Sequence, residues 1–331
     1  MEALRMITMA FGIIPAQAVA VAAELGIVDH LVGGPRSAAE LARATGTHAP
    51  SLYRLLRALA TLEVLAEDAE GRFSSTTLGD TLRSDAPGSV RGAVIMAGDP
   101  TFTRACGDMG HSVRTGAPAF DHVFGAPFFD YLTRHPEAGA VFNGGMANFS
   151  ELENPPIAAS YDFPPRARVI DVGGGRGGFI AEVLKAHATL RGVLYDLPEV
   201  VRDAAYVRAA GVADRCEVRS GDFFASVPEG ADVYVVKRIL HDWADEQCVR
   251  LLKTLRRAMP QSGRVLAIDA VIAPAGMPDM GSVSDLLMMV VSPGRERTED
   301  EFRQLYAAAG LRLTRVIPTP SSLSIVEGMP A

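Results

Sequence analysis

Val169-Ile170-Asp171-Val172-Gly173-Gly174-Gly175-Arg176-Gly177-Gly178 is a short apolar run that leads directly into glycines. The run predicts a buried strand, and the glycines predict a tight turn in which a ligand can touch the backbone before a helix begins. In an open α/β sheet this first turn lies at the carboxyl edge, where ligands bind. Gly173, Gly175 and Gly178 also match the GxGxxG pattern of dinucleotide sites. That match alone is weak, and the GK[ST] sequence of a phosphate-binding P-loop is absent.

The segments around this stretch alternate between strand and helix. Strands are expected at seven ranges: 168–172, 192–195, 216–219, 232–236, 264–268, 311–317 and 323–326. The first five are separated by helical or crossover segments, and strands joined in this way run parallel with helices on both faces. The last two are close together and predict a hairpin at one edge. The sequence therefore predicts a seven-stranded, largely parallel sheet late in the chain.

Acidic residues accompany the carboxyl ends of three successive strands. Asp171 lies within the first, Asp196 ends the second, and Asp222 ends the third within Gly221-Asp222-Phe223-Phe224. As a single residue, Asp196 is also compatible with an ordinary strand-end turn or with a dinucleotide ribose site. A dinucleotide site does not require the third acid and the aromatic ring. S-adenosylmethionine (SAM), which carries a cationic sulfonium and no phosphate, suits carboxylates and an apolar wall.

One histidine follows the fourth strand directly, in Lys237-Arg238-Ile239-Leu240-His241-Asp242-Trp243. This places His241 in an exposed turn at the same edge as the glycines, where catalytic groups are often found. A lone histidine more often has a structural role, but the position of His241 favours a catalytic one. Asp242 or Asp245 is expected to cap the next helix, which runs to about residue 259.

Two further acids are candidates for orienting this imidazole. Asp269 ends the fifth strand, and Glu296 lies in a loop before a helix whose capping box is Thr298 with Glu301. A carboxylate next to an imidazole fixes its orientation and stabilises its cation. The competing interpretation of Glu296 is an exposed salt bridge with Arg295 or Arg297.

The first hundred residues have a winged-helix pattern. Helices are expected at 18–31, from the capping box Ser37–Glu40 to Gly46, and from Ser51 onward, followed by a hairpin around 67–73. The helix that begins at Ser51 is the one that would contact DNA in a winged-helix protein, and it carries only Arg54 and Arg57 as basic residues. Residues 1–150 hold 11 arginines, no lysine and 15 acidic residues. Nucleic acid binding needs several cations, so packing or dimerisation is favoured over DNA binding.

Proline positions divide the middle of the chain. Residues 96–160 are expected to be helical, with breaks at Pro118, Pro127 and Pro136. The pairs Pro155-Pro156 and Pro164-Pro165 are expected to separate these helices from the sheet. We place the domain boundary near residue 100, with 1–100 as the first domain and 101–331, including the helical 101–160, as the second.

Composition excludes several classes of protein. The chain has 331 residues and a formal net charge of −7, so it lacks the basic balance of a nucleic-acid binder. The three cysteines are scattered, as in a reducing cytoplasm. No metal-ligand spacing is present among cysteines or histidines. An apolar run of about 20 residues is absent, so no membrane span is expected. Residues 5–18 only faintly resemble a signal peptide.

In their order and spacing, five motifs resemble one family. They are Asp171-Val-Gly-Gly-Gly-Arg-Gly, Tyr195-Asp196-Leu197-Pro198, Gly221-Asp222-Phe223-Phe224, Ile239-Leu240-His241-Asp242-Trp243 and Pro293-Gly294-Arg295-Glu296-Arg297-Thr298. The chain resembles SAM-dependent O-methyltransferases with an N-terminal dimerisation domain, such as caffeate, hydroxyindole and bacterial polyketide O-methyltransferases. The resemblance implies a Rossmann-like class I methyltransferase sheet, a mainly helical winged-helix-like dimerisation domain and a homodimer.

The resemblance also implies roles for particular residues. His241 would be the general base, flanked by Asp269 and Glu296. The predicted cofactor-binding residues are Asp171, Gly173, Gly175, Asp196, Leu197, Asp222, Phe223 and Lys237. The predicted substrate-binding residues are Phe142, Met146, Phe149, Asp242, Met288 and Ser292. Arg238 replaces an aromatic residue common in plant members, and Phe149 replaces a polar one, so no phenylpropanoid substrate is implied.

The sequence thus predicts a cytoplasmic, metal-independent enzyme that methylates a hydroxyl of a small aromatic molecule, such as a secondary metabolite or polyketide. N-methylation, or another reaction on the same fold with SAM, is the alternative. A winged-helix regulator that senses SAM is disfavoured by the acidic N-terminal half. A nicotinamide oxidoreductase would be distinguished by titration with both cofactors.

Overall fold

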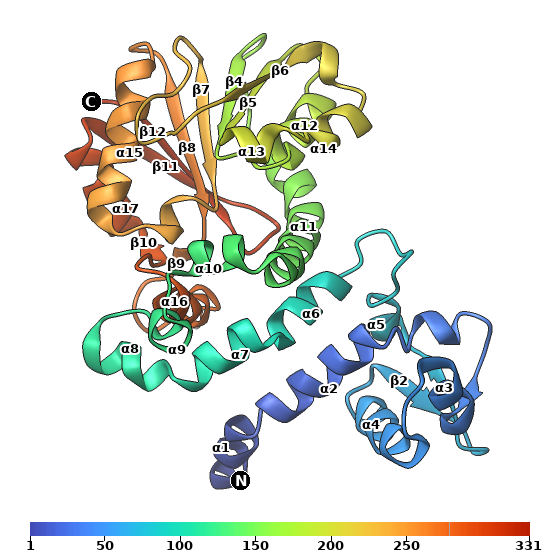
Figure 1. The fold of residues 1–331 in the computed structure, drawn as a ribbon. Coiled ribbons are helices and arrows are strands. Elements are labelled where there is room, and N and C mark those ends of the chain that lie inside the picture. The colour runs from blue at the N-terminus through green and yellow to red at the C-terminus, as the bar shows by residue number, and fades with distance from the viewer. Residues whose placement is uncertain (278) are drawn as a thin grey trace. The chain divides into compact units, whose positions relative to one another are not determined.

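The computed structural model describes residues 1–277 and 279–331. The chain folds as two compact units. One comprises Met1–Gly107 with Phe129–Phe149, and the other comprises Asp108–Phe128 with Ser150–Ala331. The long helix α11 (Pro136–Ala159) contributes residues to both units. The N-terminal helices and the large sheet are drawn in Figure 1.

The N-terminal part of the first unit has the predicted pattern of helices followed by a hairpin. Helix α3 (Ala38–Thr45) begins with the predicted Ser37–Glu40 capping box and ends at left-handed Gly46. Helix α4 (Ala49–Thr61) packs on α3 around Leu41, Leu56 and Leu59, which are fully buried. Strands β1 (Arg36–Ser37), β2 (Leu65–Glu67) and β3 (Arg72–Ser75) form a sheet in the order β1-β3-β2.

The prediction for the first helix was wrong at both ends. Instead of spanning 18–31, helix α2 runs from Ile13 to Glu24 and follows a separate helix α1 (Glu2–Ala10). Pro15 falls in the first turn of α2, where a missing N–H costs nothing. Gly26 has a φ of +62°, so the helix cannot continue through it, and a short 3-10 turn follows at Asp29–Leu31.

The middle of the chain is helical, as predicted for residues 96–160, although the helices begin earlier than predicted, with α5 (Thr77–Asp80) and α6 (Arg91–Gly98). The helices that follow are α7 (Pro100–Gly107), α8 (Met109–Thr115), α9 (Ala119–Phe124) and α10 (Phe128–Arg134). The expected break at Pro155-Pro156 is wrong, because α11 continues through both prolines to Ala159. Ile157 and Ala158, immediately beyond them, are buried in the core of the second unit. That burial outweighs the two lost backbone donors.

A seven-stranded sheet forms the centre of the second unit. Its strands are β4 (Arg168–Val172), β5 (Arg191–Asp196), β6 (Cys216–Ser220), β7 (Val233–Lys237), β8 (Arg264–Asp269), β11 (Leu311–Pro318) and β12 (Ser324–Pro330). Their order is β11-β12-β8-β7-β4-β5-β6; strands β4 to β8 run parallel to one another, and the final hairpin of β11 and β12 joins β8 antiparallel. All seven predicted strands are therefore present, and β12 extends four residues beyond its predicted end.

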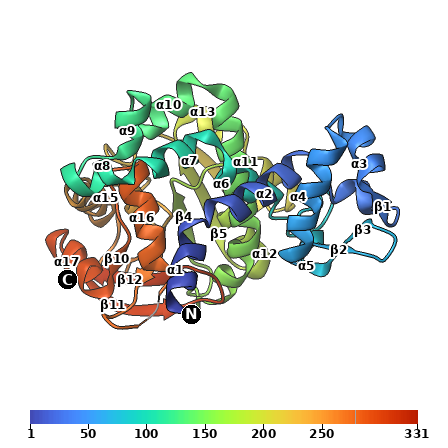
Figure 2. The same ribbon diagram turned by 90° about the horizontal axis from the view of Figure 1, so that it is seen from below.

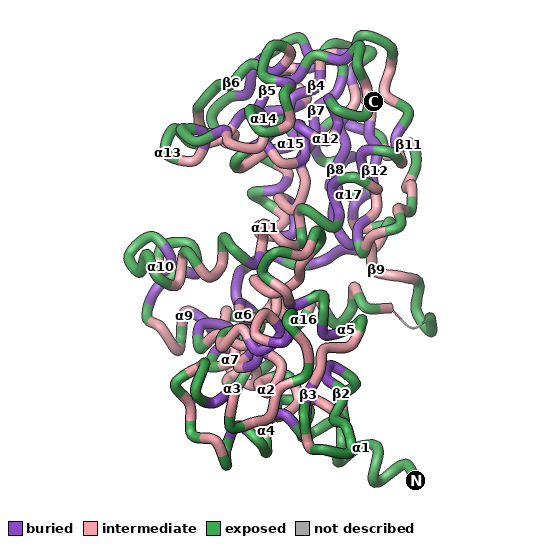
Figure 3. The backbone as a smooth tube through the Cα atoms, turned by 90° about the vertical axis from the view of Figure 1, so that its right-hand side faces the viewer, coloured by how far each residue is buried: buried purple, intermediate pink, exposed green. Residues whose placement is uncertain are grey.

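Alternate residues of the central strands belong to two separate hydrophobic cores, one on each face of the sheet. Val169, Val233 and Val235 face helices α12 (Gly178–Ala186) and α14 (Ala205–Ala209). Ile170 and Tyr234 face α15 (Asp245–Ala258) and α17 (Glu299–Ala308). This two-sided burial explains why the central strands read as nearly continuous apolar runs. Figure 3 shows these strands as mostly buried, whereas the edge strand β6 is largely exposed.

A short parallel pair, β9 (Val271–Ile272) with β10 (Arg297–Thr298), was not predicted. It ties the loop that contains Glu296 to the chain just beyond the end of β8. Helix α16 (Gly281–Val291) lies between these two strands in sequence and packs against α8 and α9. Figures 1 and 2 show α16 beside these two helices.

Candidate active site

The glycine turn after β4 has a backbone that only glycine accommodates. Gly173 has a φ of +72°, and a Cβ there would lie 2.6 Å from the Ile239 side chain. Its N–H donates to the Tyr195 carbonyl at 2.8 Å, which ties the turn to the end of β5. Gly175 has a φ of +60° and open space where a side chain would stand. At Gly175 the turn thus offers a bare backbone surface that a ligand can approach closely.

Asp171 lies under this turn with one carboxyl oxygen unpartnered. The residue is 1% exposed, and its Oδ2 has no hydrogen-bond partner among the described residues. Burial raises the pKa of Asp171 to about 7, although the charge of Lys237 works against the shift. Burial in turn lowers the pKa of the Lys237 ammonium. A buried acid without a partner is costly unless a ligand or a proton satisfies it.

The acids after β5 and β6 are brought to the same edge. Asp196 Oδ2 accepts from the Gly175 N–H at 2.8 Å, and its Oδ1 accepts from the Leu197 N–H at 2.7 Å. Burial raises the pKa of Asp196. Asp222 lies two residues beyond the end of β6, and its Oδ1 accepts from the Phe224 N–H at 2.8 Å. Each carboxylate keeps lone pairs for a ligand.

Phe223 adds an aromatic surface to this edge. Its ring edge would be 3.6 Å from a Cβ on Gly173, and its centroid is 6.5 Å from that of Trp243. Three carboxyl groups, one of which has an unpartnered buried oxygen, and an aromatic ring therefore lie at the same sheet edge as the glycine turn. This donor set fits a ligand with sugar hydroxyls, an adenine ring and a cationic centre, as SAM has.

His241 is buried at 6% exposure in the 3-10 turn Leu240–Asp242, which corrects the expectation of an exposed turn. Its Nδ1 is 3.1 Å from Glu296 Oε1, and its Nε2 is 3.6 Å from Asp242 Oδ1. If Nδ1–H donates to the carboxylate, Nε2 keeps a lone pair that can accept a proton.

Buried arginine holds the loop that carries Glu296 against the histidine turn. Arg297 has no exposed surface; it donates to the Leu240 carbonyl at 2.8 Å and to the Trp243 carbonyl at 2.9 Å. A Cβ on Gly294 would lie 1.9 Å from the His241 carbonyl oxygen, so the two loops are in direct contact. The turn and the loop therefore form one packed unit.

Two interpretations of the neighbouring charges were wrong. Arg295 and Arg297 pair with Asp245 at 2.8 Å, so among the described residues neither is the partner of Glu296, which is 2% exposed. Asp242 or Asp245 was expected to cap α15, but the N-cap is Ala244 and makes no side-chain cap. The carboxylate of Asp245 is instead occupied by the two guanidinium groups.

The acids around His241 determine its basicity. Burial disfavours the imidazolium, but the charge of Asp242, the hydrogen bond with Glu296 and the charge of Asp269 outweigh it and raise the pKa of His241 to about 9. Asp269 is completely buried, and neither of its carboxyl oxygens has a hydrogen-bond partner among the described residues. Burial raises the pKa of Asp269 to about 7.

Glu153 is a buried residue of this edge that sequence reasoning missed. Its carboxylate lies 3.0 Å from Arg238 Nε, 3.4 Å from Lys237 Nζ and 3.1 Å from Ser322 Oγ. Arg238 has a φ of +54°, which is unfavourable for a residue with a side chain. Glu153 lies near the end of α11 in a segment without a motif, so only the fold reveals the pairing.

The predicted substrate-binding residues fall into two groups. Phe142, Met146 and Phe149 lie on α11 within the first unit. The others, Asp242, Met288 and Ser292, lie in the second unit. Ser292 is buried, and its hydroxyl accepts from the Gly294 N–H at 3.2 Å. Their joint role in substrate binding stays a prediction.

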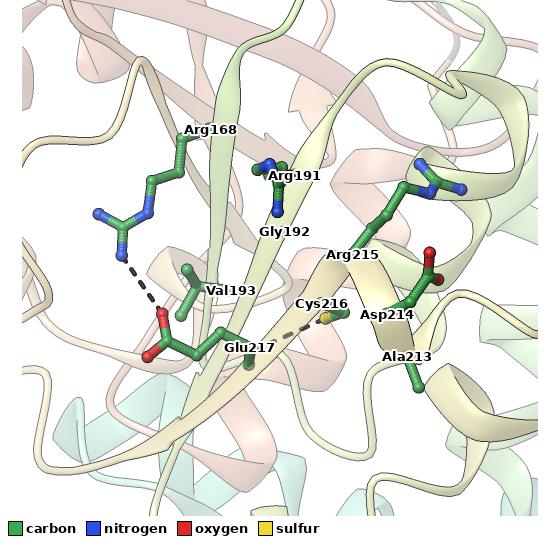
Figure 4. Close-up of a pocket in the computed structure, with 9 residues that line it drawn as sticks. All are labelled: Arg168, Arg191, Gly192, Val193, Ala213, Asp214, Arg215, Cys216 and Glu217. Atoms are coloured by element: carbon green, nitrogen blue, oxygen red, sulfur yellow. Dashed lines mark hydrogen bonds and ion pairs between the residues drawn. The ribbon is translucent and has the colours of Figure 1, made fainter.

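A hollow of about 320 Å³ lies at the opposite, amino edge of β4, β5 and β6 (Figure 4). Two of the arginines that line this hollow have partners within the protein. Arg168 lies 3.5 Å from Glu217, and Arg215 donates to the Leu184 carbonyl at 2.8 Å. This hollow is therefore separate from the carboxyl-edge site and contributes none of the predicted residues.

Among the described residues, no single helix has the length and apolarity to cross a membrane. The bent pair α1 and α2 meets that criterion by length and composition only.

Comparison with known proteins identifies the family. Residues 107–312 match the O-methyltransferase domain, and residues 7–85 match the O-methyltransferase dimerisation domain. The chain belongs to this family and is a SAM-dependent O-methyltransferase. It is 42% identical to phenazine O-methyltransferase PhzM of Lysobacter antibioticus over 95% of this chain and 92% of that protein. It is 39% identical to the 8-amino-8-demethylriboflavin N,N-dimethyltransferase of Streptomyces davaonensis over 92% and 89% of the two chains.

Solved structures have the same fold. CalO1, a methyltransferase in calicheamicin biosynthesis solved with SAH bound, has a TM-score of 0.88 and 43% identity over 100% of this chain and 98% of its own. NcsB1, an O-methyltransferase from neocarzinostatin biosynthesis, was solved with SAM and 2-hydroxy-5-methyl naphthoic acid. It has a TM-score of 0.81 and 37% identity, with 96% of each chain covered. The predicted family and fold class are thus confirmed.

The buried carboxyl of Asp171 gives a testable effect on stability. Its pKa in the folded protein is about 7, above the ordinary 3.8, so the native state binds more protons than the unfolded state between those values. Its contribution to stability therefore falls as pH rises through this window. We expect the Asp171→Asn variant to be more stable than the natural chain, by a margin that grows from pH 5 to pH 8. Stability is measured as the urea concentration at the midpoint of unfolding.

The matched control is Asp203→Asn. Hydrogen bonds from Arg176 and Arg208 hold the pKa of this exposed carboxyl below its usual value. Its substitution should not change the pH dependence between pH 5 and 8. Parallel profiles for Asp171→Asn and the natural chain would show that Asp171 is ionised throughout.

Proposed function

We propose that this enzyme transfers the methyl group of SAM to a hydroxyl of a small aromatic metabolite, with His241 as general base. The observation that carries the proposal is the buried hydrogen bond between His241 Nδ1 and Glu296. With Nδ1–H donating to Glu296, Nε2 would be the nitrogen that accepts the proton, and it lies 3.6 Å from Asp242 Oδ1. The turn that carries His241 is close in the fold to the glycine turn, because Gly173 packs on Ile239. The aromatic metabolites named for relatives support the acceptor class.

The acidity of the acceptor explains why a base is needed. A phenol has a pKa of about 10, so little phenolate is present at neutral pH. Neutral His241 can take the phenol proton as the oxygen attacks, which contributes roughly 10²–10⁴-fold. Glu296 keeps the ring oriented and stabilises the imidazolium that forms. Alignment of the reacting atoms supplies most of the remaining acceleration.

The carboxyl-edge residues would hold the cofactor. Asp196 and Leu197 would bind the ribose, Asp222 and Phe223 the adenosine, and the glycine turn the amino acid part. The unpartnered oxygen of Asp171 would act through the same turn, next to Lys237. When bound, SAM supplies an electrophilic methyl group and a positive charge. These assignments require no metal ion for methyl transfer.

An N-acceptor is the second candidate. It is favoured by the identity of 39% to the N,N-dimethyltransferase that acts on 8-amino-8-demethylriboflavin. A neutral amine has a free lone pair, so it needs the base only to take up the proton that leaves after attack. The two candidates therefore differ in how strongly the rate depends on His241. We favour oxygen because the histidine is held in a basic, oriented state.

We expect His241→Gln to reduce kcat by at least about 10²-fold while the Kd for SAM changes little, because the variant cannot accept the phenolic proton. The assay follows label transfer from SAM to a panel of phenols, naphthols and polyketide aglycones, with aromatic amines included. SAM affinity is measured by calorimetry.

His48→Gln is the control, because His48 is exposed, contacts Ser51 and lies immediately before α4 in the N-terminal domain. It should behave as the natural chain. Turnover of a phenol by His241→Gln at an undiminished rate would contradict the base assignment. Methyl transfer only to amines would favour the second candidate.

The pH dependence tests how the base is tuned. Because the pKa of His241 is raised to about 9, kcat/KM should rise with pH and level off near pH 9, as the neutral imidazole accumulates. The hydrogen bond with Glu296 contributes to this shift. Glu296→Gln should therefore level off at a lower pH and reach a lower plateau, since the ring also loses its orienting charge.

The control for this profile is Glu182→Gln, whose carboxylate pairs with Lys185 on α12. Its profile should coincide with that of the natural chain. A Glu296→Gln profile with an unmoved midpoint would show that Glu296 does not set the basicity of the histidine.

We also propose that the chain forms a homodimer through its N-terminal helices. Helix α1 has no buried residue in the single chain. Apolar side chains exposed by more than half accumulate here: Leu4, Met6, Ile7, Met9, Phe11, Ile13 and Ile14. An exposed apolar surface of this kind is characteristic of an interaction site. A second copy is the partner that the matched dimerisation domain supports.

Charged substitutions in this surface should separate the subunits. We expect Ile7→Lys combined with Ile14→Lys to convert a dimer of 35.1 kDa chains into monomers, because burying the new charges in an apolar interface is unfavourable. Light scattering coupled to gel filtration measures the mass. The exposed Val113→Lys, on α8, should remain dimeric. A monomeric natural chain, or a dimer that survives both substitutions, would contradict this interface.

A further inference from the structure

A cluster of metal-ligating side chains lies apart from the methyl-transfer site. It consists of Asp108, which precedes α8, His111 within α8 and His122 within α9. One possible ligand atom from each residue lies within 4.8 Å of the others. All three residues belong to the second unit. The chemistry proposed above uses none of them.

Local structure brings these residues together. Asp108 and His111 are three residues apart at the start of a helix, so their side chains share a face. The chain then turns at Gly116, which has a φ of +74°, and the Ala119 N–H donates to Ser112 Oγ at 2.8 Å. This turn returns His122 to the same face. The spacings match no metal motif, which is why the sequence predicts no ligand set.

The contacts within the cluster are close. His122 Nδ1 lies 2.7 Å from Asp108 Oδ2. The rings of His111 and His122 are stacked, with centroids 4.2 Å apart and an interplanar angle of 5°. Two imidazoles and one carboxylate thus converge where a single cation can reach all three.

We propose that Asp108, His111 and His122 form a binding site for a divalent transition-metal ion, with Zn²⁺ as the representative. Two imidazole nitrogens and one carboxylate oxygen suit Zn²⁺ and related ions, whereas Mg²⁺ and Ca²⁺ prefer all-oxygen sites. Ligand atoms on a tetrahedral Zn²⁺ are about 3.3 Å apart, given bonds of about 2.0–2.2 Å. Ligand atoms that lie as far as 4.8 Å apart would therefore approach by about 1.5 Å, whereas His122 Nδ1 and Asp108 Oδ2, which are 2.7 Å apart, would separate slightly to admit the ion.

Exposure makes both that adjustment and metal entry possible. The side chain of His122 is 60% exposed and that of Asp108 is 33% exposed, so the rings can rotate out of their stack without disturbing a core. The fourth position would remain open to water, as in zinc sites with three protein ligands. A bound ion would link α8 to α9, both of which pack on α16. Metal binding should therefore raise the thermal stability of the protein.

The test uses the full chain without a histidine tag, after dialysis against a chelator. Calorimetry with Zn²⁺ and visible absorption with Co²⁺ should show uptake of one equivalent per chain, with a rise in Tm. His111→Asn and His122→Asn should each weaken the affinity at least tenfold. His48→Asn, outside the cluster, should leave it unchanged.

His122 is exposed, so His122→Asn provides a test even if His111→Asn fails to fold. Circular dichroism establishes that each variant is folded. The proposal is overturned if the natural chain shows no saturable uptake, or if His122→Asn binds the ion as tightly as the natural chain. Because no proposed catalytic residue is changed, methyl transfer by the natural chain stays a separate question.

Discussion

The buried contact between His241 and Glu296 depends on a third residue that touches neither substrate nor cofactor in our proposal. Arg297 lies completely inside the protein and donates to two carbonyls of the histidine turn, Leu240 and Trp243, while Asp245 balances its charge. Only a rigid, planar fork of N–H donors can serve three acceptors in these directions. A lysine has no such geometry. Without this arginine, the two carbonyls would be buried without donors, and the loop that places Glu296 would lose its anchor.

The carboxyl edge of the sheet carries more acidic side chains than its basic side chains can neutralise. Asp171 and Asp269 have pKa values raised to about 7 by burial, and the first lies near the glycine turn. A cation bound at that turn would stabilise the ionised form of Asp171. The same positive charge would disfavour the imidazolium of His241, so the base would become easier to keep neutral. A cationic ligand and this excess of acid are therefore complementary, which a phosphate-bearing cofactor would not be.

Most of the sheet could be predicted because its signals are local. Apolar runs mark the strands, and the order of acids at their ends follows from parallel topology, so Asp171, Asp196 and Asp222 were placed at one edge from sequence alone. The two capping boxes were also correct, since their hydrogen bonds join residues three apart. Features decided by tertiary packing could not be predicted in this way.

Three particular errors illustrate that limit. The helix that continues through Pro155-Pro156 is stabilised by burial of residues beyond the prolines, which no local rule reports. Asp245 resembles a helix cap in sequence, but two arginines fifty residues away engage it. Glu153 pairs with Lys237 and Arg238 across more than eighty residues. Long-range ion pairs of this kind leave no periodic or spacing signal.

In our proposal, the raised pKa of His241 favours oxygen over nitrogen as the methyl acceptor. Proton transfer between groups of similar pKa is nearly thermoneutral, and a histidine at about 9 is close to a phenol at about 10. A histidine with the ordinary pKa of about 6.5 would take the same proton unfavourably, because its pKa lies more than three units below that of the phenol. The cost is that only a small fraction of the free enzyme carries a neutral imidazole at pH 7. Such a low fraction of neutral imidazole is useful only if the reaction needs a strong base. A neutral amine acceptor would not require one.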